Sequence, residues 1–177
     1  VHRLFGLKFW AMIVGAAPLD PDLERFWGSL GFLVVQGYGL TETAPIVTLV
    51  HPFHGAREAG AVGKPIAGVE VKIAEDGEIL VRGENVTHGY YRAPEATRAA
   101  FTDGWFHTGD IGGLDAEGQL HIRGRKKEMI VTPEGLNVFP EDIERVLNAM
   151  TGVLESAVVG APVAGSTAER VQAVVRI

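Results

Sequence analysis

The 177 residues contain no cysteine and no apolar stretch long enough to cross a bilayer, so neither a disulfide scaffold nor a transmembrane anchor is indicated. Positive charge is also scarce, because 16 Lys and Arg stand against 22 Asp and Glu and give a net charge of -6. The one basic cluster, residues 123–127, is short and is followed by Glu128, so nucleic acid is not an expected partner. No signal peptide is visible, and we expect a cytoplasmic protein.

The most informative stretch that is present reads QGYGLTET, at residues 36–43. Its two glycines allow the backbone to approach a flat ring or a phosphate closely, and Tyr38 offers an aromatic face for a base. Thr41 supplies a hydroxyl for a phosphate oxygen, and Glu42 supplies a carboxylate for a hard divalent cation. A structural turn followed by a helix cap would give the same letters, so the loop alone does not decide between these interpretations.

Two apolar runs and a helical segment lead into this loop. Residues 9–14 and 32–35 predict buried strands, and between them Asp20 and Pro21 open a helix that ends near a glycine. Strand, helix and strand in this order predict a βαβ unit with a parallel sheet. Ligands of such sheets bind beyond the carboxyl ends of the strands. The turn at residues 15–18 and the glycine loop should therefore face one crevice.

The pattern changes after about residue 58. Short alternating runs at 69–74 and 78–82 flank Asp76 and Gly77, which form a strong hairpin signal. Further elements are predicted as follows: a hairpin of 111–114 with 119–123, a short helix at 94–101, a helix opened by Pro140, and strands at 154–160 and 170–177. We therefore predict an α/β fold in three parts: the end of a parallel-sheet domain at 1–57, an antiparallel β subdomain at 58–124, and the start of an α+β C-terminal domain at 125–177.

Five groups of motifs, in order, resemble the adenylate-forming superfamily of acyl-CoA synthetases, luciferases and peptide-synthetase adenylation domains. They are VGAAPL (14–19) with GYGLTET (37–43), GEILVRG (77–83) with GYY (89–91), GWFHTGD (104–110), GRKKEMI (124–130), and GLNVFPEDIE (135–144). Each motif alone is a weak signal, but their shared order extends over nearly the whole chain. On these motifs the chain is identified as a member of this superfamily.

The resemblance implies roles for individual residues. Thr41 would contact the α-phosphate of ATP and Glu42 would hold Mg²⁺, which makes them the candidate catalytic residues and Glu42 the candidate metal ligand. Asp110 would accept hydrogen bonds from the ribose hydroxyls, and Arg125 would bind the nucleotide. The other implied nucleotide contacts are Gly15, Ala16, Ala17, Gln36, Gly37, Tyr38, Gly39 and Ile122. Without the motifs, Asp110 would be an ordinary turn residue, Arg125 a surface cation and Ile122 part of the core.

Two further positions concern the C-terminal domain, which the resemblance implies is a mobile lid. Lys127 matches the family's hinge, where a change in backbone angles swings this domain between the two half-reactions. Gly135 matches a glycine that lets the pantetheine arm of coenzyme A pass close to the backbone. The ordinary alternative for Lys127 is a solvated surface lysine.

The implied reaction joins a carboxylic acid to ATP, with release of pyrophosphate, and then transfers the acyl group from AMP to a thiol, usually coenzyme A. ATP, Mg²⁺ and coenzyme A are thus the expected cofactors and substrates. The doubled lysine at 126–127 and the run at 137–140 look most like bacterial long-chain fatty acid CoA ligases, although a medium-chain or aryl acid stays open. The alternatives are an adenylation domain that loads a carrier protein and a non-catalytic module that binds adenine nucleotide.

Parts of the family's machinery have no counterpart in these residues. The Ser/Thr/Gly-rich phosphate loop is missing, and no lysine stands in the context of the family's catalytic lysine; the lysines are Lys8, Lys64, Lys72, Lys126 and Lys127. Because the chain also begins with Val1, we expect an excised or partial polypeptide that is inactive or nearly so by itself. Strand edges without partners should make it self-associate. Peripheral membrane contact of the parent protein is left open.

Overall fold

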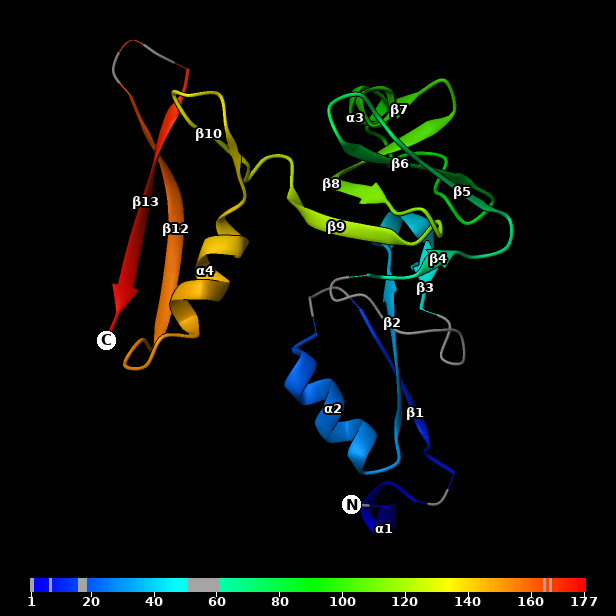
Figure 1. The fold of residues 1–177 in the computed structure, drawn as a ribbon. Helices are drawn as coiled ribbons and strands as arrows, with labels where there is room; N and C mark the ends of the chain where they lie inside the picture. The colour runs from blue at the N-terminus through cyan, green and yellow to red at the C-terminus, as the bar shows by residue number, and fades with distance from the viewer. Residues whose placement is uncertain (1, 7, 16–18, 51–60, 164, 166) are drawn as a thin grey trace. The chain divides into compact units, whose positions relative to one another are not determined.

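The computed structural model describes residues 2–6, 8–15, 19–50, 61–163, 165 and 167–177 (Figure 1). The chain forms two compact units: Val1–Thr108 with Gly112–Ile122, and Gly109–Ile111 with Arg123–Ile177. Several sheets and few helices give a mixed α/β fold, and this confirms the predicted fold class. The predicted three-part division at 1–57, 58–124 and 125–177 stays a prediction.

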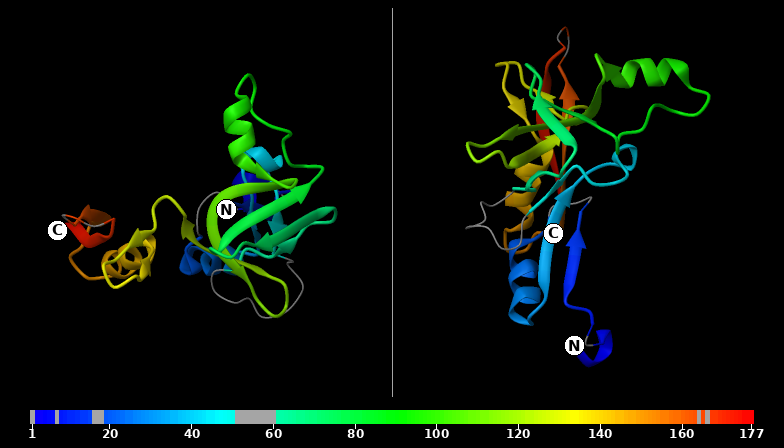
Figure 2. Two further views of the ribbon diagram at one scale, coloured as in Figure 1. Left: turned by 90° about the horizontal axis from the view of Figure 1, so that it is seen from above. Right: turned by 90° about the vertical axis from the view of Figure 1, so that its right-hand side faces the viewer.

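The first unit begins with α1 (His2–Phe5), β1 (Ala11–Val14), α2 (Pro21–Ser29) and β2 (Leu33–Tyr38). Strands β1 and β2 are parallel, with Ala11 opposite Leu33, and α2 runs alongside β2 (Figures 1 and 2). Helix α2 begins where predicted, because the Asp20 carboxylate accepts hydrogen bonds from the N–H groups of Asp22 at 2.7 Å and Leu23 at 3.3 Å. The predicted βαβ unit is therefore present.

Antiparallel strands then extend this sheet and build a second one. The short strands β3 (Thr48–Leu49) and β4 (Lys64–Pro65) give the order β1-β2-β3-β4. The second sheet has the order β5-β6-β8-β7, with β9 paired to β8. Its elements are β5 (Val69–Ile73), β6 (Glu78–Gly83), α3 (Pro94–Ala100), β7 (Phe101–Thr102), β8 (Trp105–Leu114) and β9 (Leu120–Arg125). Strand β2 reaches Tyr38, so the first three residues of the glycine loop belong to a strand.

The core of the first unit lies where these two sheets meet. Its buried members are Tyr38, Val47, Ile79, Val81, Val86, Phe106 and Leu120. The β5–β6 turn is fixed as the sequence predicts, because the Asp76 side chain accepts from the N–H of Glu78 at 3.1 Å and Gly77 adopts a φ of 86°. Residues from both sheets thus support the end of β2, where the candidate site begins.

The second unit contains β10 (Ile130–Val131), β11 (Asn137–Val138), α4 (Pro140–Asn148), β12 (Glu155–Pro162) and β13 (Glu169–Arg176). Strands β10 and β11 form one antiparallel pair, and β12 and β13 form another. Helix α4 packs on β12, and the Glu144 carboxylate accepts from the N–H of Val158 at 2.7 Å. A helix on a two-stranded antiparallel sheet is the predicted α+β arrangement.

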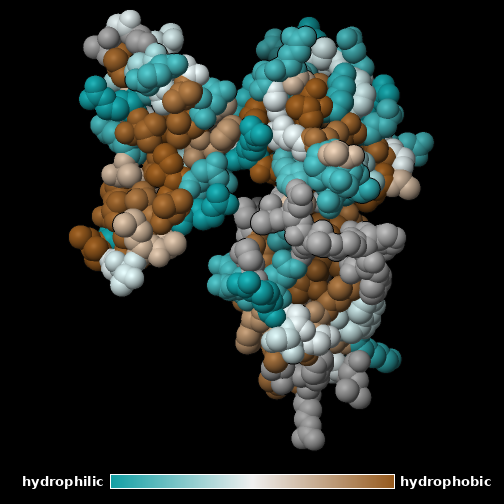
Figure 3. All heavy atoms as spheres, viewed as in Figure 1, coloured by the Kyte–Doolittle hydropathy of each residue, from teal (hydrophilic) through white to brown (hydrophobic). Residues whose placement is uncertain are grey.

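The second unit also exposes much apolar surface, over α4, β12 and β13 (Figure 3). Its exposed large apolar side chains are Val131, Leu136, Val146, Met150, Leu154, Val159, Val174, Val175 and Ile177. Exposed apolar area of this kind favours association, and self-association stays a prediction. None of the helices in the described part of the chain has the length and apolar character needed to span a membrane.

Candidate functional site

The candidate loop leaves β2 at Tyr38 and closes in a single 3₁₀ turn, η1 (Thr41–Thr43). The Thr43 hydroxyl, which is fully buried, accepts from the N–H of Leu40 at 2.9 Å and donates to the carbonyl of Leu40 at 3.0 Å. These two bonds fix the backbone of the turn. Thr41 is exposed and Glu42 is half-buried, so the two candidate catalytic side chains lie on a closed turn with access to solvent.

Asn85, which follows β6, braces this turn from a distant part of the sequence. Its side-chain NH₂ group donates to the carbonyls of Thr43 and Ile46, both at 2.8 Å. Two acceptors at this distance fix the orientation of the amide. The Asn85 Oδ1 atom is buried and makes no hydrogen bond within the described residues. The NH₂ group alone therefore holds both ends of the segment that follows Glu42.

Replacing Asn85 with alanine should lower the free energy of unfolding by about 1–3 kcal/mol, because two partly buried carbonyls lose their donor. Urea unfolding followed by circular dichroism would measure the change. The matched control is Asn148→Ala, since the exposed Asn148 side chain accepts a hydrogen bond from the Ser156 hydroxyl at 2.9 Å and, within the described residues, holds no backbone carbonyl that would lose a donor. That control should change the free energy by about 0.5 kcal/mol or less. Equal changes for both variants would contradict the proposed brace.

Glu42 is held by two groups that the sequence analysis did not identify. The Tyr90 hydroxyl donates to Glu42 Oε1 at 3.0 Å, and the N–H of Thr87 donates to the Glu42 carbonyl at 2.7 Å. Partial burial raises the pKa of Tyr90, and its hydrogen bond to the Glu42 carboxylate raises it further. The tyrosine therefore acts as the hydrogen-bond donor of this pair at neutral pH.

The glycines of the loop have packing roles of their own. A Cβ on Gly39 would lie 1.8 Å from the carbonyl oxygen of Pro45, and one on Gly37 would lie 2.8 Å from the Leu49 side chain. A Cβ on Gly15 would lie 3.2 Å from the carbonyl oxygen of Gly37, so the ends of β1 and β2 are close together, as predicted. Ala16 and Ala17, the other predicted contacts of this turn, lie outside the described residues.

Gln36, Tyr38 and Ile122 are positioned by the sheets of the first unit. Gln36 lies in β2 opposite Val14, and its carbonyl accepts from the N–H of Val50 at 2.8 Å. The Tyr38 ring is buried in the apolar core, against which Ile122 packs. The structure thus brings Tyr38 and Ile122 into one cluster. Their contact with adenine stays a prediction.

Asp110 and Arg125, both in the second unit, form an ion pair with a Nη1 to Oδ1 distance of 3.0 Å. The Asp110 side chain is buried, with 7% of its surface exposed, whereas 49% of the Arg125 side chain is exposed. The N–H of Lys126 donates to the carbonyl of Gly109 at 2.8 Å, which ties the two segments together. Two predicted ribose and nucleotide contacts, 15 residues apart in the sequence, are therefore neighbours in space.

The predicted hinge and coenzyme A positions lie in exposed turns of the second unit. Lys127 is exposed in the turn that the N–H of Glu128 closes on the Arg125 carbonyl at 3.1 Å. Gly135 has a φ of 80°, and apart from its own backbone and its two chain neighbours no atom of the described residues lies within 4 Å of the position a Cβ would take. The β10–β11 turn therefore needs this backbone conformation and leaves open space beside it. Both functional roles stay predictions.

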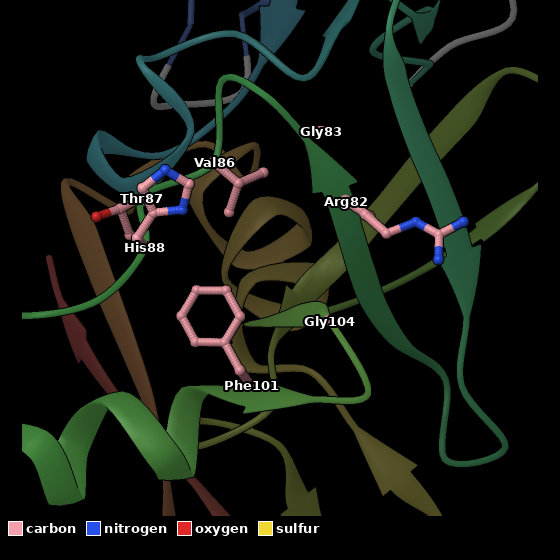
Figure 4. A pocket seen from close by; sticks show the side chains of 7 residues that line it. All are labelled: Arg82, Gly83, Val86, Thr87, His88, Phe101 and Gly104. Atoms are coloured by element: carbon pink, nitrogen blue, oxygen red, sulfur yellow. The ribbon is translucent and has the colours of Figure 1, made fainter.

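A cavity of about 240 Å³ lies next to the segment that contains Asn85. It is lined by Arg82, Gly83, Val86, Thr87, His88, Phe101 and Gly104 (Figure 4). The Arg82 side chain points away from Val86 and Phe101 in this view. Its guanidinium instead pairs with Glu70 at 2.8 Å and stacks over the Trp105 ring at 4.5 Å. Arg82 therefore lines the cavity without directing its charged group into it.

Glu42 fits a magnesium ion that is held mainly by a nucleotide. Mg²⁺ in such sites takes one or two protein carboxylates and completes its shell with phosphate oxygens and waters. Glu42 is a half-buried carboxylate whose Oε1 accepts from Tyr90, while Oε2 accepts no hydrogen bond within the described residues. Those residues contain no cluster of three or more His, Asp or Glu side chains that could hold a metal ion without help from a bound nucleotide.

The chain's family is established by comparison with known proteins. Residues 2–91, about half of the chain, match the family described as AMP-binding enzyme. The structure agrees, because O-succinylbenzoate coenzyme A synthetase (MenE) from Bacillus subtilis, solved in complex with ATP and magnesium ion, aligns with a TM-score of 0.82 at 33% identity. The alignment covers 93% of this chain and 36% of the synthetase. This chain belongs to the AMP-binding, adenylate-forming enzymes.

Two relatives show how broad the substrate range of its neighbours is. The chain is 47% identical over 150 residues to the long-chain-fatty-acid–CoA ligase FadD15 of Mycobacterium bovis, which covers 85% of this chain and 25% of the relative. It is 40% identical over 151 residues to the 2-succinylbenzoate–CoA ligase of Listeria monocytogenes, with 85% and 32% covered. The chain thus spans about a quarter to a third of the length of these relatives.

Proposed function

We propose that residues 1–177 form the adenylate-binding part of an ATP-dependent acyl-CoA ligase, and that its acid is a long-chain fatty acid. The observation that carries the proposal is the closed turn after β2, which presents Thr41 and Glu42 at the carboxyl end of a parallel strand pair. Ligands of open α/β sheets bind at this end of the strands. The higher identity to FadD15 than to the 2-succinylbenzoate ligase supports the long-chain acid.

Each side chain has a defined task in this proposal. The Thr41 hydroxyl donates to an α-phosphate oxygen, and the buried Asp110 carboxylate accepts from the ribose hydroxyls. Arg125 holds the Asp110 carboxylate in place and contributes a positive charge to the nucleotide. Glu42 would hold Mg²⁺, which supplies positive charge to offset the negative charge that develops during attack on the α-phosphate. Coenzyme A passes Gly135 in the second half-reaction.

The 177 residues lack part of the machinery that the complete reaction needs. Of the lysines Lys8, Lys64, Lys72, Lys126 and Lys127, none stands in the context of the family's catalytic lysine. We therefore propose that this chain binds adenine nucleotides and acyl-adenylates but forms little or no thioester by itself. The cytoplasmic location stays part of the same proposal.

Calorimetric titration of the chain with AMP and with a nonhydrolysable palmitoyl-adenylate mimic tests this function directly. We expect both to bind, and the mimic to bind more tightly because it adds apolar contact to the same nucleotide contacts. A folded chain that binds neither compound would overturn the proposal. The acid is tested separately in the full reading frame that encodes these residues, by comparing thioester formation from palmitate and from 2-succinylbenzoate. Faster turnover of 2-succinylbenzoate would overturn the long-chain assignment.

A further inference from the structure

The segment that follows β6 makes four hydrogen bonds to residues 42–46, which include part of the turn that carries Thr41 and Glu42 and the residues just after it. Two come from the Asn85 side chain, one from the N–H of Thr87 and one from the Tyr90 hydroxyl. Three of the four end on backbone carbonyls and fix the path of the chain. The Tyr90 bond differs, because it ends on the Glu42 carboxylate, the one functional group of the turn suited to a cation.

The backbone of Tyr90 is itself held at two groups, because its carbonyl accepts from the N–H of Ala93 at 3.2 Å and its N–H is also bonded. Its backbone N–H donates to the Thr97 hydroxyl at 2.9 Å, and that hydroxyl donates to the Ala93 carbonyl at 2.9 Å. Thr97 belongs to α3, so the tyrosine is anchored on the first turns of a helix. At the preceding residue, a Cβ on Gly89 would lie 2.5 Å from Thr97 Cγ2, so the chain passes close against this helix. The backbone of Tyr90 is thus fixed independently of Glu42.

We propose that Tyr90 is a positioning residue for the magnesium ion that accompanies the bound nucleotide. Its hydroxyl holds Glu42 Oε1, which would leave Oε2 available to the cation. This assignment rests on the proposed function, because it requires that Glu42 is a ligand of Mg²⁺. A glutamate otherwise loses rotamer freedom when it binds a cation, and a fixed donor removes part of that loss before the ion arrives. Partners of this kind change metal affinity by about 10- to 100-fold when they are removed.

The test measures how strongly Mg²⁺ and nucleotide help each other to bind, without any turnover. The affinity of the 177-residue chain for α,β-methylene ATP is measured by calorimetry in EDTA and in saturating Mg²⁺, and the ratio of the two affinities gives the coupling. Binding of Mg²⁺ to the nucleotide in solution is common to all variants, so it cancels when variants are compared. Tyr90→Phe should reduce this ratio about 10-fold and leave the affinity for AMP in EDTA unchanged.

Tyr91 provides the matched control. Its side chain is 87% exposed and its ring stacks with Arg92 at 5.1 Å, a contact that phenylalanine keeps. Tyr91→Phe should therefore leave the coupling at the wild-type value. Glu42→Gln should abolish most of the coupling, because it removes the negative charge while keeping an oxygen that can accept from Tyr90. In the Glu42→Gln background, Tyr90→Phe should have no further effect, because both substitutions act through one carboxylate.

The outcomes separate this inference from the function on which it rests. Wild-type coupling in Tyr90→Phe, with AMP still bound, would overturn the role of Tyr90 alone. If Tyr90→Phe lowered the coupling further in the Glu42→Gln background, that result would also overturn the role, because the tyrosine would then act through a group other than the Glu42 carboxylate. Failure of the wild-type chain to bind AMP in EDTA would overturn the proposed function, and the role of Tyr90 with it.

Discussion

Replacing Asp110 with alanine should weaken AMP binding by about 10- to 100-fold, which corresponds to the loss of hydrogen bonds to an ionised acceptor. The carboxylate is almost fully buried and pairs with Arg125 at 3.0 Å, so its oxygens are oriented before a ribose arrives. The Arg125 side chain is half-exposed, and water can solvate it when its partner is removed. The substitution should therefore affect the ligand more than the fold, as calorimetry and a thermal melt of the same sample would show.

The control for Asp110 is an ion pair of the same type in the same unit. Asp142 pairs with Arg145 at 2.9 Å on α4, but both side chains are largely exposed, at 59% and 79%. Asp142→Ala should leave AMP affinity unchanged and the melting temperature nearly so, because exposed pairs contribute little. Asp110→Asn keeps the size of the side chain, so it serves as a second variant with which AMP affinity can be measured if Asp110→Ala does not fold. Wild-type AMP affinity in folded Asp110→Ala would show that the buried pair is structural.

The local elements could be predicted from sequence because their determinants lie within a few residues. Asp20 and Pro21 define the start of α2, and Asp76 with Gly77 defines the β5–β6 turn. The end of β2 and the start of β8 were harder to predict from the sequence. Strand β2 continues to Tyr38 within a glycine-containing motif, where pairing with β3 keeps it extended. Strand β8 begins at Trp105, within the motif at 104–110, where it pairs with β7. Sheet pairing thus overrides the local preference of glycine.

The candidate site was predictable in its residue types and less so in its supports. Asp110 and Arg125 were identified from their motifs, and the structure brings them together. Asn85 and Tyr90 were not identified, although Tyr90 lies in a motif that contributed to the family resemblance. Asn85 and Thr43 are 42 positions apart, and Tyr90 and Glu42 are 48 apart. Contacts over such separations depend on the folded topology and leave no periodic pattern in a single sequence.

Replacing Gly39 with alanine should destabilise the chain by about 3 kcal/mol or more, whether or not nucleotide is present. The new Cβ would lie 1.8 Å from the carbonyl oxygen of Pro45 and 2.7 Å from its carbonyl carbon. Both are backbone atoms, so no side-chain rotation relieves the overlap. The loop would have to separate from residues 45–46, where the Ile46 carbonyl already accepts from Asn85 at 2.8 Å. Urea unfolding with and without AMP measures the effect.

Gly28 in α2 gives the opposite result for the same chemical change. Outside the helix's own backbone and the two neighbouring residues, no atom in the described part of the chain lies within 4 Å of a Cβ at this position. Alanine in a helix is more stable than glycine by about 1 kcal/mol. Gly28→Ala should therefore raise the free energy of unfolding while Gly39→Ala lowers it. If folded Gly39→Ala kept wild-type stability and lost only AMP affinity, the glycine would serve the approach of the ligand. If it lost stability to the same extent with and without AMP, the glycine would serve the close approach of two chain segments, and the nucleotide site would depend on that packing.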